Sequence, residues 1–365
     1  MARRIFIAAT GQNSGKTTTS LSLVHMARKK YQRVGFVKPI GPKPSSFEGV
    51  SADKDAILMA RVFGLLDDLP LMSPFVLMPG DTRRVLDGDL SMDSIRSAML
   101  DAMQELDDKN DFLIIEGAGH SGVGSVLGFG NAEIAAAMQA PVLMVAGGGV
   151  GNVVDAVHMN LALFEKRQVP VAALLTNKII PDKREQTLHY LNLAFAGVPL
   201  KVIGGFNYQP ILANPTMRRI SSVLGVDLRA NEEEAQRIVH HVQIGAASTQ
   251  RVAELLKESS LLIVNSSRDE LLVTLANLYQ IPEYREKISG VIVPGVVSVS
   301  HITQKILDRS GLPYMRSHRT STEVFQTITD DVSKLTAEDT HKIKLIEELA
   351  EKRLDFDAID ALLDN

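Results

Sequence analysis

Apolar residues in this 365-residue chain fall into short runs that alternate with helical patterns. The runs Ile5–Ile7, Phe112–Ile115 and 141–146 are continuous, which is typical of strands buried on both faces of a parallel sheet. Between such runs, apolar residues recur at helical spacing, for example over residues 91–106. The repeated strand–helix order over residues 1–225 therefore predicts an α/β domain with a mostly parallel sheet and helices on both faces.

The same alternation continues after a charged stretch at residues 227–234. Three strand–helix repeats follow between residues 261 and 328, so we predict a second, smaller α/β domain at residues 226–335. The polar turn at residues 265–269 is either an anion site or a helix cap. By contrast, the Gly-, Pro- and Ser-rich stretch 41–50 predicts a loop.

The last segment, residues 336–365, predicts a C-terminal helix. It begins with a capping-box pattern, Thr336–Asp339, in which Asp replaces the usual Glu. An apolar stripe follows at Ile343, Ile346, Leu349 and Ala350. Its polar face mixes both charge signs, so we expect this helix to pack on the body of the protein or on a second subunit, and not on a membrane.

Composition and charge narrow the classes of function. A net charge of −4, 5% aromatic residues and scattered basic pairs argue against a nucleic-acid-binding face. The chain has no cysteine, which excludes disulfides, a thiol nucleophile and zinc–thiolate sites. No apolar run approaches the ~18 residues of a membrane span, and the start of the chain lacks the pattern of a signal peptide. We therefore expect a cytoplasmic protein.

The main candidate for chemistry is the stretch Thr10–Thr18, which follows a predicted strand and opens a predicted helix. Its Gly-Lys-Thr run and its position match a P-loop, although Thr10 stands where the usual pattern has its first glycine. We expect phosphate binding by Gly11, Gln12, Asn13, Ser14, Gly15, Lys16, Thr17 and Thr18. Lys16 would neutralise a β- or γ-phosphate, and the Thr17 hydroxyl would bind Mg²⁺. A plain strand-to-helix turn explains neither the run nor its position.

Further polar residues follow other predicted strands or open a helix, and ligands gather at the carboxyl ends of parallel strands. Lys38 is either a substrate or phosphate ligand or a surface lysine. Asp53 and Asp55 cap a helix, or one of them helps to hold Mg²⁺. Glu116, followed by small residues, has the place of a Walker-B-type acid. Asn177 either binds an adenine edge or forms a turn.

These motifs resemble a known family. Residues 1–225 resemble the dethiobiotin synthetase-like P-loop domain, which is related to cobyrinate and cobyrate amidases. The residues that carry this resemblance are Thr10–Thr17, Lys38-Pro39, Asp55-Ala56, Glu116–Gly119 and Asn177. Residues from about 230 to 335 resemble the DRTGG domain, with Ser267–Glu270 in place of its polar loop. Together the two domains resemble the amino-terminal portion of long phosphotransacetylases, whose acetyl-transfer domain would need roughly 300 more residues, so we expect no acetyl transfer here.

The resemblance implies a P-loop NTPase-type fold, ATP and Mg²⁺ as cofactors, and a homodimer. It implies that Lys16 holds phosphates, that Lys38 contacts a substrate carboxylate or carbamate, and that Asn177 binds adenine. Lys16 and Lys38 are thus the candidate catalytic residues. It implies Thr17, Asp55 and Glu116 as Mg²⁺ ligands. However, residues 120–125 depart from the glycine and apolar residues that follow in dethiobiotin synthetases, which argues against diaminopelargonate as the substrate.

Two functions stay open. The first is an ATP-dependent ligase that acts through an acyl phosphate. The second is a non-catalytic, nucleotide-sensing regulator of acetate or cofactor metabolism, whose second domain binds an unknown small molecule. ATP and Mg²⁺ binding is common to both, and we expect neither to bind nucleic acid or a membrane.

Overall fold

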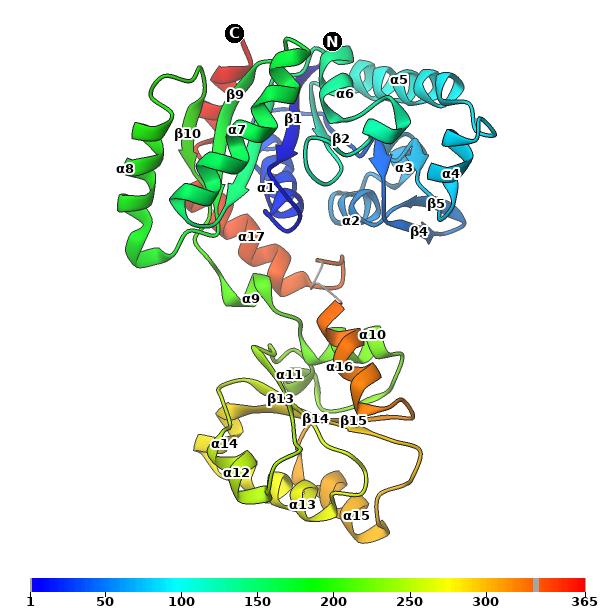
Figure 1. Cartoon of the computed structure of the whole chain (residues 1–365), viewed down its shortest axis with the longest axis vertical. Helices are drawn as coiled ribbons and strands as arrows, with labels where there is room; N and C mark the ends of the chain where they lie inside the picture. The colour runs from blue at the N-terminus through cyan, green and yellow to red at the C-terminus, as the bar shows by residue number, and fades with distance from the viewer. Residues whose placement is uncertain (1, 331–334, 365) are drawn as a thin grey trace. The chain divides into compact units, whose positions relative to one another are not determined.

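The computed structural model describes residues 2–330 and 335–364, and this part of the chain forms two compact units (Figure 1). The first unit contains the described residues up to Tyr208 and those from Leu335 onward. The second contains the described residues from Gln209 onward, up to residue 330. Residues 331–334, which the sequence assigned to the second domain, lie outside the described residues. The domain boundaries at 226 and 336 stay predictions.

A six-stranded sheet forms the centre of the first unit, and all its neighbouring strands are parallel. In spatial order the strands are β10 (Lys201–Gly204), β9 (Val171–Asn177), β8 (Val142–Gly147), β1 (Arg3–Ala9), β7 (Phe112–Glu116) and β2 (Val34–Val37). Every residue of β7 and β2 is buried, which agrees with their continuous apolar sequence. The mostly parallel sheet predicted from the sequence is therefore confirmed.

Helices cover both faces of this sheet. Helix α1 (Lys16–Ala27) lies behind the sheet in Figure 1, whereas α6 (Asn131–Ala137) and α7 (Val150–Lys166) lie in front of it. The connection from β1 to β2 and the connection from β7 to β8 run in opposite directions along the sheet. Because such crossovers are right-handed, they place their helices on opposite faces. The other helices of this unit before residue 208 are α2 (Lys54–Phe63), α3 (Leu69–Met72), α4 (Asp81–Leu86), α5 (Met92–Lys109) and α8 (Arg184–Ala194).

A small hairpin lies between β2 and α2, where the sequence predicted only a loop. Strands β4 (Pro44–Phe47) and β5 (Val50–Asp53) pair antiparallel through a two-residue turn at Glu48-Gly49. Both turn residues have positive φ, 49° and 84°, as a hairpin turn of this length requires. Two further short strands pair with each other, β3 (Ile40–Gly41) and β6 (Phe75–Val76). The loop prediction for residues 41–50 is therefore wrong.

The C-terminal segment forms two helices, α17 (Thr340–Arg353) and α18 (Phe356–Ala361), and both contact α1. Ile343, Ile346 and Ala350 of the predicted stripe are buried, so the expected packing on the body is confirmed. Asp339, and not Thr336, is the N-cap residue of α17. The Thr336 N–H and hydroxyl both donate to the Asp339 carboxylate, which forms a turn before the helix, so the predicted capping box is wrong.

The second unit is a smaller α/β structure with a five-stranded sheet. In spatial order the strands are β11 (Leu228–Arg229), β15 (Tyr314–Ser317), β14 (Ile288–Pro294), β13 (Ser260–Ile263) and β12 (His241–Ile244). Strands β12 to β15 are parallel, and only the short β11 is antiparallel to its neighbour. A second α/β domain is therefore confirmed, with the edge strands β11 and β12 that the sequence did not predict.

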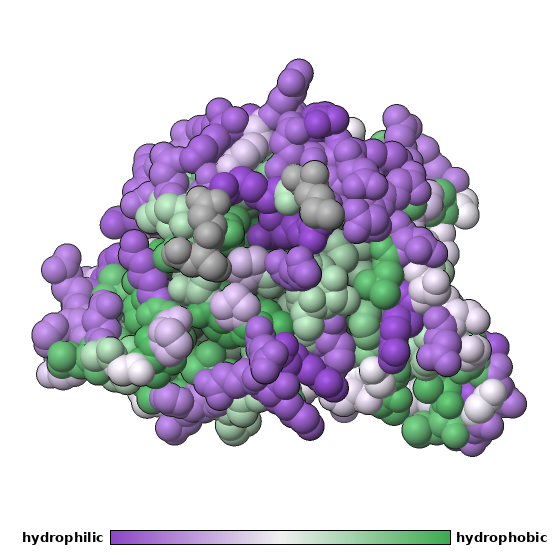
Figure 2. All heavy atoms as spheres, turned by 90° about the horizontal axis from the view of Figure 1, so that it is seen from above, coloured by the Kyte–Doolittle hydropathy of each residue, from purple (hydrophilic) through white to green (hydrophobic). Residues whose placement is uncertain are grey.

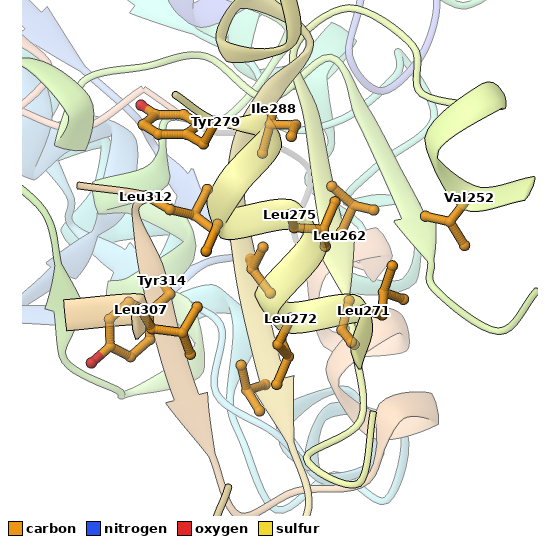
Figure 3. Packing of buried hydrophobic residues seen from close by; sticks show 14 of the residues in the cluster. Val252, Leu262, Leu271, Leu272, Leu275, Tyr279, Ile288, Leu307, Leu312 and Tyr314 are labelled. Atoms are coloured by element: carbon orange, nitrogen blue, oxygen red, sulfur yellow. The ribbon is translucent and has the colours of Figure 1, made fainter. Parts of the chain in front are cut away.

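Two apolar layers cover the two faces of this second sheet. Leu262 and Val291 pack under α13 (Asp269–Leu278) and α15 (His301–Ser310), as Figure 3 shows for the labelled members of this cluster. On the other face, Ile263 packs with residues of α10 (Met217–Leu224) and α16 (Ser321–Asp330). The remaining helices are α9 (Pro210–Ala213), α11 (Glu232–Ala235), α12 (Thr249–Glu254) and α14 (Pro282–Lys287).

The surface mixes polar and apolar residues. Figure 2 shows hydrophilic residues over much of one face, with hydrophobic residues between them. Within residues 2–330 and 335–364, no helix combines the length and the apolar character that crossing a membrane requires.

Candidate nucleotide-binding site

The loop at residues 10–15 joins β1 to α1 with the geometry of a phosphate-binding turn. Gly15 has φ 99°, and a Cβ there would lie 2.1 Å from Asn177 Nδ2, so a side chain does not fit. The Ser14 hydroxyl donates to Gly11 O (3.0 Å) within the loop. Thr10, directly after β1, donates its N–H to Val145 O (3.1 Å) and has no positive φ, so this position does not require the usual glycine.

The first two turns of α1 direct polar side chains toward the end of β7. Lys16 Nζ donates to Gly119 O (2.5 Å), and the Thr17 hydroxyl donates to Asp55 Oδ1 (3.4 Å). One turn after Lys16, the buried Ser20 hydroxyl donates to Glu116 Oε2 (2.6 Å). The free N–H groups of the helix start and the Lys16 ammonium therefore lie beside a carboxylate pair.

Lys38, directly after β2, lies between these two carboxylates. Its Nζ lies 2.5 Å from Glu116 Oε1 and 3.2 Å from Asp55 Oδ2, and it also donates to Gly117 O at 3.4 Å. All three charged side chains are buried. Buried charges are stable only when they are paired, so the cluster depends on each member.

A second lysine, Lys43, contacts the carboxylate of Asp55 from the side of the β4–β5 hairpin. Its Nζ lies 2.9 Å from Asp55 Oδ2. Asp53 caps α2 by accepting the Asp55 N–H (2.8 Å), and its other oxygen accepts the Lys43 N–H (2.9 Å). The sequence pointed to a capping role or a metal role for Asp53 and Asp55, and the structure shows Asp53 in the cap and Asp55 in the lysine cluster.

The backbone after Glu116 is held by one buried asparagine. Asn131, the first residue of α6, donates from Nδ2 to Ala118 O and to His120 O, both at 2.8 Å. Its Oδ1 accepts the Ala118 N–H at 3.0 Å. The carbonyl of Gly119, which accepts from Lys16, thus lies within a backbone segment that Asn131 fixes on both sides.

Asn177, the last residue of β9, contacts the P-loop from the opposite side. Its Nδ2 donates to Ser14 O (3.2 Å), and its Oδ1 accepts the Lys178 N–H (2.9 Å). The Asn177 side chain is buried. These two hydrogen bonds use one of the two N–H donors of its side-chain amide and one acceptor position of its oxygen. Asn177 therefore braces the loop, and its predicted contact with adenine stays a prediction.

The charges of the cluster shift one another's pKa values. Burial alone would raise the pKa of Asp55, but Lys38 and Lys43 hold it well below its usual range. Burial would likewise lower the pKa of Lys38, but Glu116 and Asp55 keep it above its ordinary value. Burial lowers the pKa of Lys16 to about 8, because the attraction of Glu116 only partly offsets the loss of water and the repulsion of nearby lysines. Burial and the charge of Asp55 raise the pKa of Asp53.

Comparison with known proteins agrees with this geometry. The family model of an AAA domain matches residues 3–216, more than half of the chain. The chain belongs to the AAA domain family. A DRTGG domain follows this AAA domain, because its family model matches residues 219–330.

Relatives of the AAA domain chain include two kinds of protein. Phosphate acetyltransferase of Nitratidesulfovibrio vulgaris is 22% identical over 377 residues, which cover 100% of this chain and 52% of the relative. ATP-dependent dethiobiotin synthetase BioD of Anaeromyxobacter dehalogenans is 26% identical over 185 residues, 49% of this chain and 78% of the relative. BioD of Methanocaldococcus jannaschii is 32% identical over 119 residues, 32% of this chain and 52% of the relative. The chain spans about half the length of the phosphate acetyltransferases that it matches.

Two solved structures show weaker likeness. A GTPase of Pyrococcus abyssi in apo form covers 56% of this chain at 11% identity, with a TM-score of 0.34. The CBS and DRTGG domains of Clostridium perfringens pyrophosphatase cover 36% of this chain at 20% identity, with a TM-score of 0.28. Neither score is high enough to show a shared fold.

The side chains beside the P-loop of the AAA domain suit Mg²⁺ held together with phosphates. Thr17, Asp55 and Glu116 offer hydroxyl and carboxylate oxygens, the donors that this cation prefers. Among the residues that the structure describes, no three or more His, Cys, Asp or Glu side chains form a group that could hold a metal ion. Mg²⁺ commonly uses one or two carboxylates and completes its shell with water and substrate phosphates, so the two carboxylates present fit that role.

The structure brings most of the predicted site residues together at the carboxyl ends of β1, β2 and β7. Thr17, Lys38, Asp55 and Glu116 form one network of hydrogen bonds and ion pairs, and Lys16 interacts with its members through charge. Around it, the predicted phosphate ligands occupy the P-loop and the first turn of α1: Gly11, Gln12, Asn13, Ser14, Gly15 and Thr18. Their roles toward ATP and Mg²⁺ stay predictions.

Three residues of this network were missed from the sequence: Ser20, Lys43 and Asn131. Ser20 lies four residues after Lys16, so helical spacing places it on the same face as the P-loop lysine, and this signal was available. Asn131 opens a helix directly after Gly130, a common position for a residue that bonds nearby backbone. Lys43 gave no signal, because its contact depends on the hairpin.

The predicted polar turn of the second unit is used internally. Asn265 Oδ1 accepts the Ser267 N–H (3.0 Å), and the Arg268 guanidinium donates to Gly245 O (3.1 Å) and Ala247 O (3.0 Å). No side chain caps α13, so the predicted helix cap is wrong. Anion binding at this turn stays a prediction.

A groove of about 380 Å³ lies elsewhere in the second unit, between α13 and α15. His301, Lys305 and Arg309 line it at four-residue spacing along α15, so they form one stripe. Its lining also contains the apolar side chains of Ala276 and Ile306. Within the described part of the chain, the three basic side chains contact no carboxylate.

Proposed function

We propose that the AAA domain unit binds Mg-ATP at the P-loop. One observation supports this most: the Lys16 ammonium, the start of α1 and the oxygens of Thr17, Asp55 and Glu116 lie together at the carboxyl ends of β1 and β7. Helix N-termini with a glycine-containing turn attract phosphate, and Lys16 adds a full positive charge. The similarity to proteins named ATP-dependent dethiobiotin synthetase supports ATP as the nucleotide.

We infer that bound Mg-ATP serves phosphoryl transfer to a carboxylate or carbamate. An oxygen of that acceptor would form a bond to the γ-phosphorus while the bond to the bridging oxygen breaks, and ADP would leave with that electron pair. The products would be ADP and an acyl phosphate. An amine would then form a bond to the acyl carbon while the bond from that carbon to the phosphate oxygen breaks, which releases inorganic phosphate and, after loss of a proton, leaves an amide. Mg²⁺ would offset the charge of the phosphates. Lys16 would stabilise the transferring group from a fixed position.

Residues 120–125 would lie on the acceptor side of this site. The sequence His120–Ser125 differs from the glycine and apolar residues of dethiobiotin synthetases. Asn131 holds the start of this segment in place, and Ser121 is buried. The acceptor is therefore proposed to differ from diaminopelargonate, whereas the phosphate-binding residues are retained.

A second candidate is a regulatory role, which the groove of the second unit favours. Three basic side chains without a carboxylate partner among the described residues would attract an anionic small molecule. Inorganic pyrophosphate is a suitable probe, and Lys16→Ala removes the contribution of the P-loop. If the groove binds anions, pyrophosphate binds to Lys16→Ala and loses most of its affinity when Lys305→Glu and Arg309→Glu are added. Equal affinity without the two basic residues would exclude this site.

Substrate-stimulated turnover separates the two candidates. Phosphate release from Mg-ATP is measured with bicarbonate, small carboxylates and diamines as acceptors. Release that rises with one acceptor and disappears in Lys16→Ala supports the ligase. Saturable Mg-ATP binding with no acceptor-dependent release supports the regulator. A cytoplasmic location and homodimerisation remain predictions from the sequence.

A further inference from the structure

Lys43 is the member of the lysine pair on Asp55 that keeps access to solvent. Lys38 and Lys43 both contact Asp55 Oδ2, at 3.2 and 2.9 Å. The Lys38 side chain is 2% exposed, whereas that of Lys43 is 30% exposed. A ligand that approaches this side of Asp55 from solvent therefore reaches Lys43 before Lys38.

The two ammonium groups also differ in how many donors are in use. Each lysine has three N–H donors. Those of Lys38 are directed to Glu116, Asp55 and Gly117. Within the described residues, the ammonium of Lys43 contacts Asp55 alone. Lys43 thus keeps two N–H donors and a positive charge for a further acceptor.

The backbone of Lys43 is fixed, unlike that of an ordinary surface lysine. Its N–H donates to Asp53 Oδ2 (2.9 Å), and its carbonyl accepts the Lys54 N–H (3.1 Å). Gly41 allows this close approach, because a Cβ there would lie 2.6 Å from the Cβ of Asp53. The start of the hairpin is therefore attached to the start of α2, and Lys43 is held beside Asp55.

The loop after Glu116 lies against the chain segment that leads into the same hairpin. A Cβ on Gly124 would lie 3.0 Å from Cδ1 of Ile40, and Ile40 stands three residues before Lys43 in the sequence. The segment 120–125, where the sequence departs from dethiobiotin synthetases, thus adjoins the segment that carries Lys43. The departing segment 120–125 and Lys43 therefore border the same side of the site.

We propose that Lys43 binds a carboxylate group of the acceptor, so that the molecule that joins Mg-ATP at this site is an anion. This inference rests on the proposed function and adds to it the charge of the acceptor. A carboxylate oxygen matches the two free N–H donors of Lys43, and charge-assisted hydrogen bonds of this kind are strong. The same positive charge disfavours a diamine, because like charges placed together oppose binding.

The test uses the full chain saturated with Mg²⁺ and a non-hydrolysable β,γ-imido analogue of ATP. Succinate and 1,4-diaminobutane, which have the same number of carbons and opposite charges, are titrated by calorimetry. Lys43→Met removes the proposed contact. Lys54→Met is the matched control, because Lys54 is exposed and lies next to Asp55 in sequence. The affinity of the analogue itself is measured first in each variant.

The expected result is binding of succinate and not of the diamine, with an affinity about tenfold to a hundredfold weaker in Lys43→Met. The analogue should bind equally well to the original chain and to Lys54→Met, and succinate is titrated into Lys43→Met at an analogue concentration that saturates this variant. No succinate binding, equal succinate affinity in Lys43→Met, or binding of the diamine overturns the inference. A loss of succinate affinity in Lys43→Met that is no larger than its loss of analogue affinity also overturns it, because Lys43 would then act through the nucleotide site. No binding of the analogue to the original chain refutes the proposed function instead.

Discussion

Replacing Lys38 with methionine tests the buried charge cluster most strongly. Lys38→Met keeps a long unbranched side chain and removes only the ammonium group. Glu116 would keep its hydrogen bond from the Ser20 hydroxyl, and Asp55 would keep its ion pair with the partly exposed Lys43. However, no cation would lie between the two carboxylates. Breaking a buried ion pair by removing one partner costs about 3–5 kcal/mol. Since domains are stable by about 5–15 kcal/mol, this is a large fraction of the total.

Hydrogen exchange of peptides that cover β7 is the assay, because it reports on the first unit separately from the second. We expect the opening free energy of β7 to fall by about 3–5 kcal/mol in Lys38→Met at pH 7. Lys54→Met, a lysine substitution at an exposed position nearby, should leave it unchanged. A loss below about 1 kcal/mol would refute the reasoning, because such values are typical of surface ion pairs.

The pH dependence of Lys38→Met gives a second check on the same reasoning. In the original chain the pKa of Asp55 is well below its usual range, so this carboxylate stays charged and paired at pH 5. Without Lys38, burial and the nearby charge of Glu116 raise the pKa of Asp55 above its unfolded value. Protonation at lower pH then relieves the repulsion, so the variant regains stability relative to the original chain between pH 7 and pH 5. A difference that grows over this range would contradict the account.

Two further predictions concern Lys16 and the C-terminal helices. The pKa of Lys16 is about 8 in the folded protein, and phosphate binding requires its charged form. In calorimetric titrations, Mg-ATP affinity should therefore be nearly constant from pH 6 to 7.5 and fall by about tenfold between pH 7.5 and 9. Constant affinity up to pH 9 would exclude a neutral Lys16. Ile346→Ala on α17 should reduce the stability of the first unit by about 2–4 kcal/mol in hydrogen exchange of α1 peptides, because Ile346 is buried against the body. Leu349→Ala, at a half-buried position, should reduce this stability by less than Ile346→Ala does. Equal losses of stability in the two variants would argue against this packing of α17.

The sheet and the convergence of its polar residues were predictable from the sequence for physical reasons. Strands covered on both faces have continuous apolar sequences, so β7 and β8 were visible as runs. The carboxyl ends of neighbouring parallel strands meet at one edge, so Lys38 and Glu116 were expected to lie close together. The structure places them 2.5 Å apart.

The hairpin and its consequences were not predictable in the same way. Strand β4 is mostly half-exposed, and β5 contains both exposed and buried residues. Their sequences include Pro and Ser and show no alternation of apolar and polar residues. Their pairing depends on the positive φ of Glu48, a conformation that is uncommon for this residue type. Lys43 reaches Asp55 only because that turn forms, so its contact could not be inferred from spacing. The edge strand β12 was missed because it is short and none of its four residues is buried.

The most direct test of the central claim is calorimetric titration of the full chain with Mg-ATP, beside Lys16→Ala and Lys54→Met. We expect saturable binding at one site for each chain and the same affinity in Lys54→Met. In Lys16→Ala we expect a loss of affinity of about a hundredfold or more, because the phosphates would lose a charged hydrogen bond from a fixed position. No binding at millimolar Mg-ATP, or equal affinity in Lys16→Ala, would contradict it.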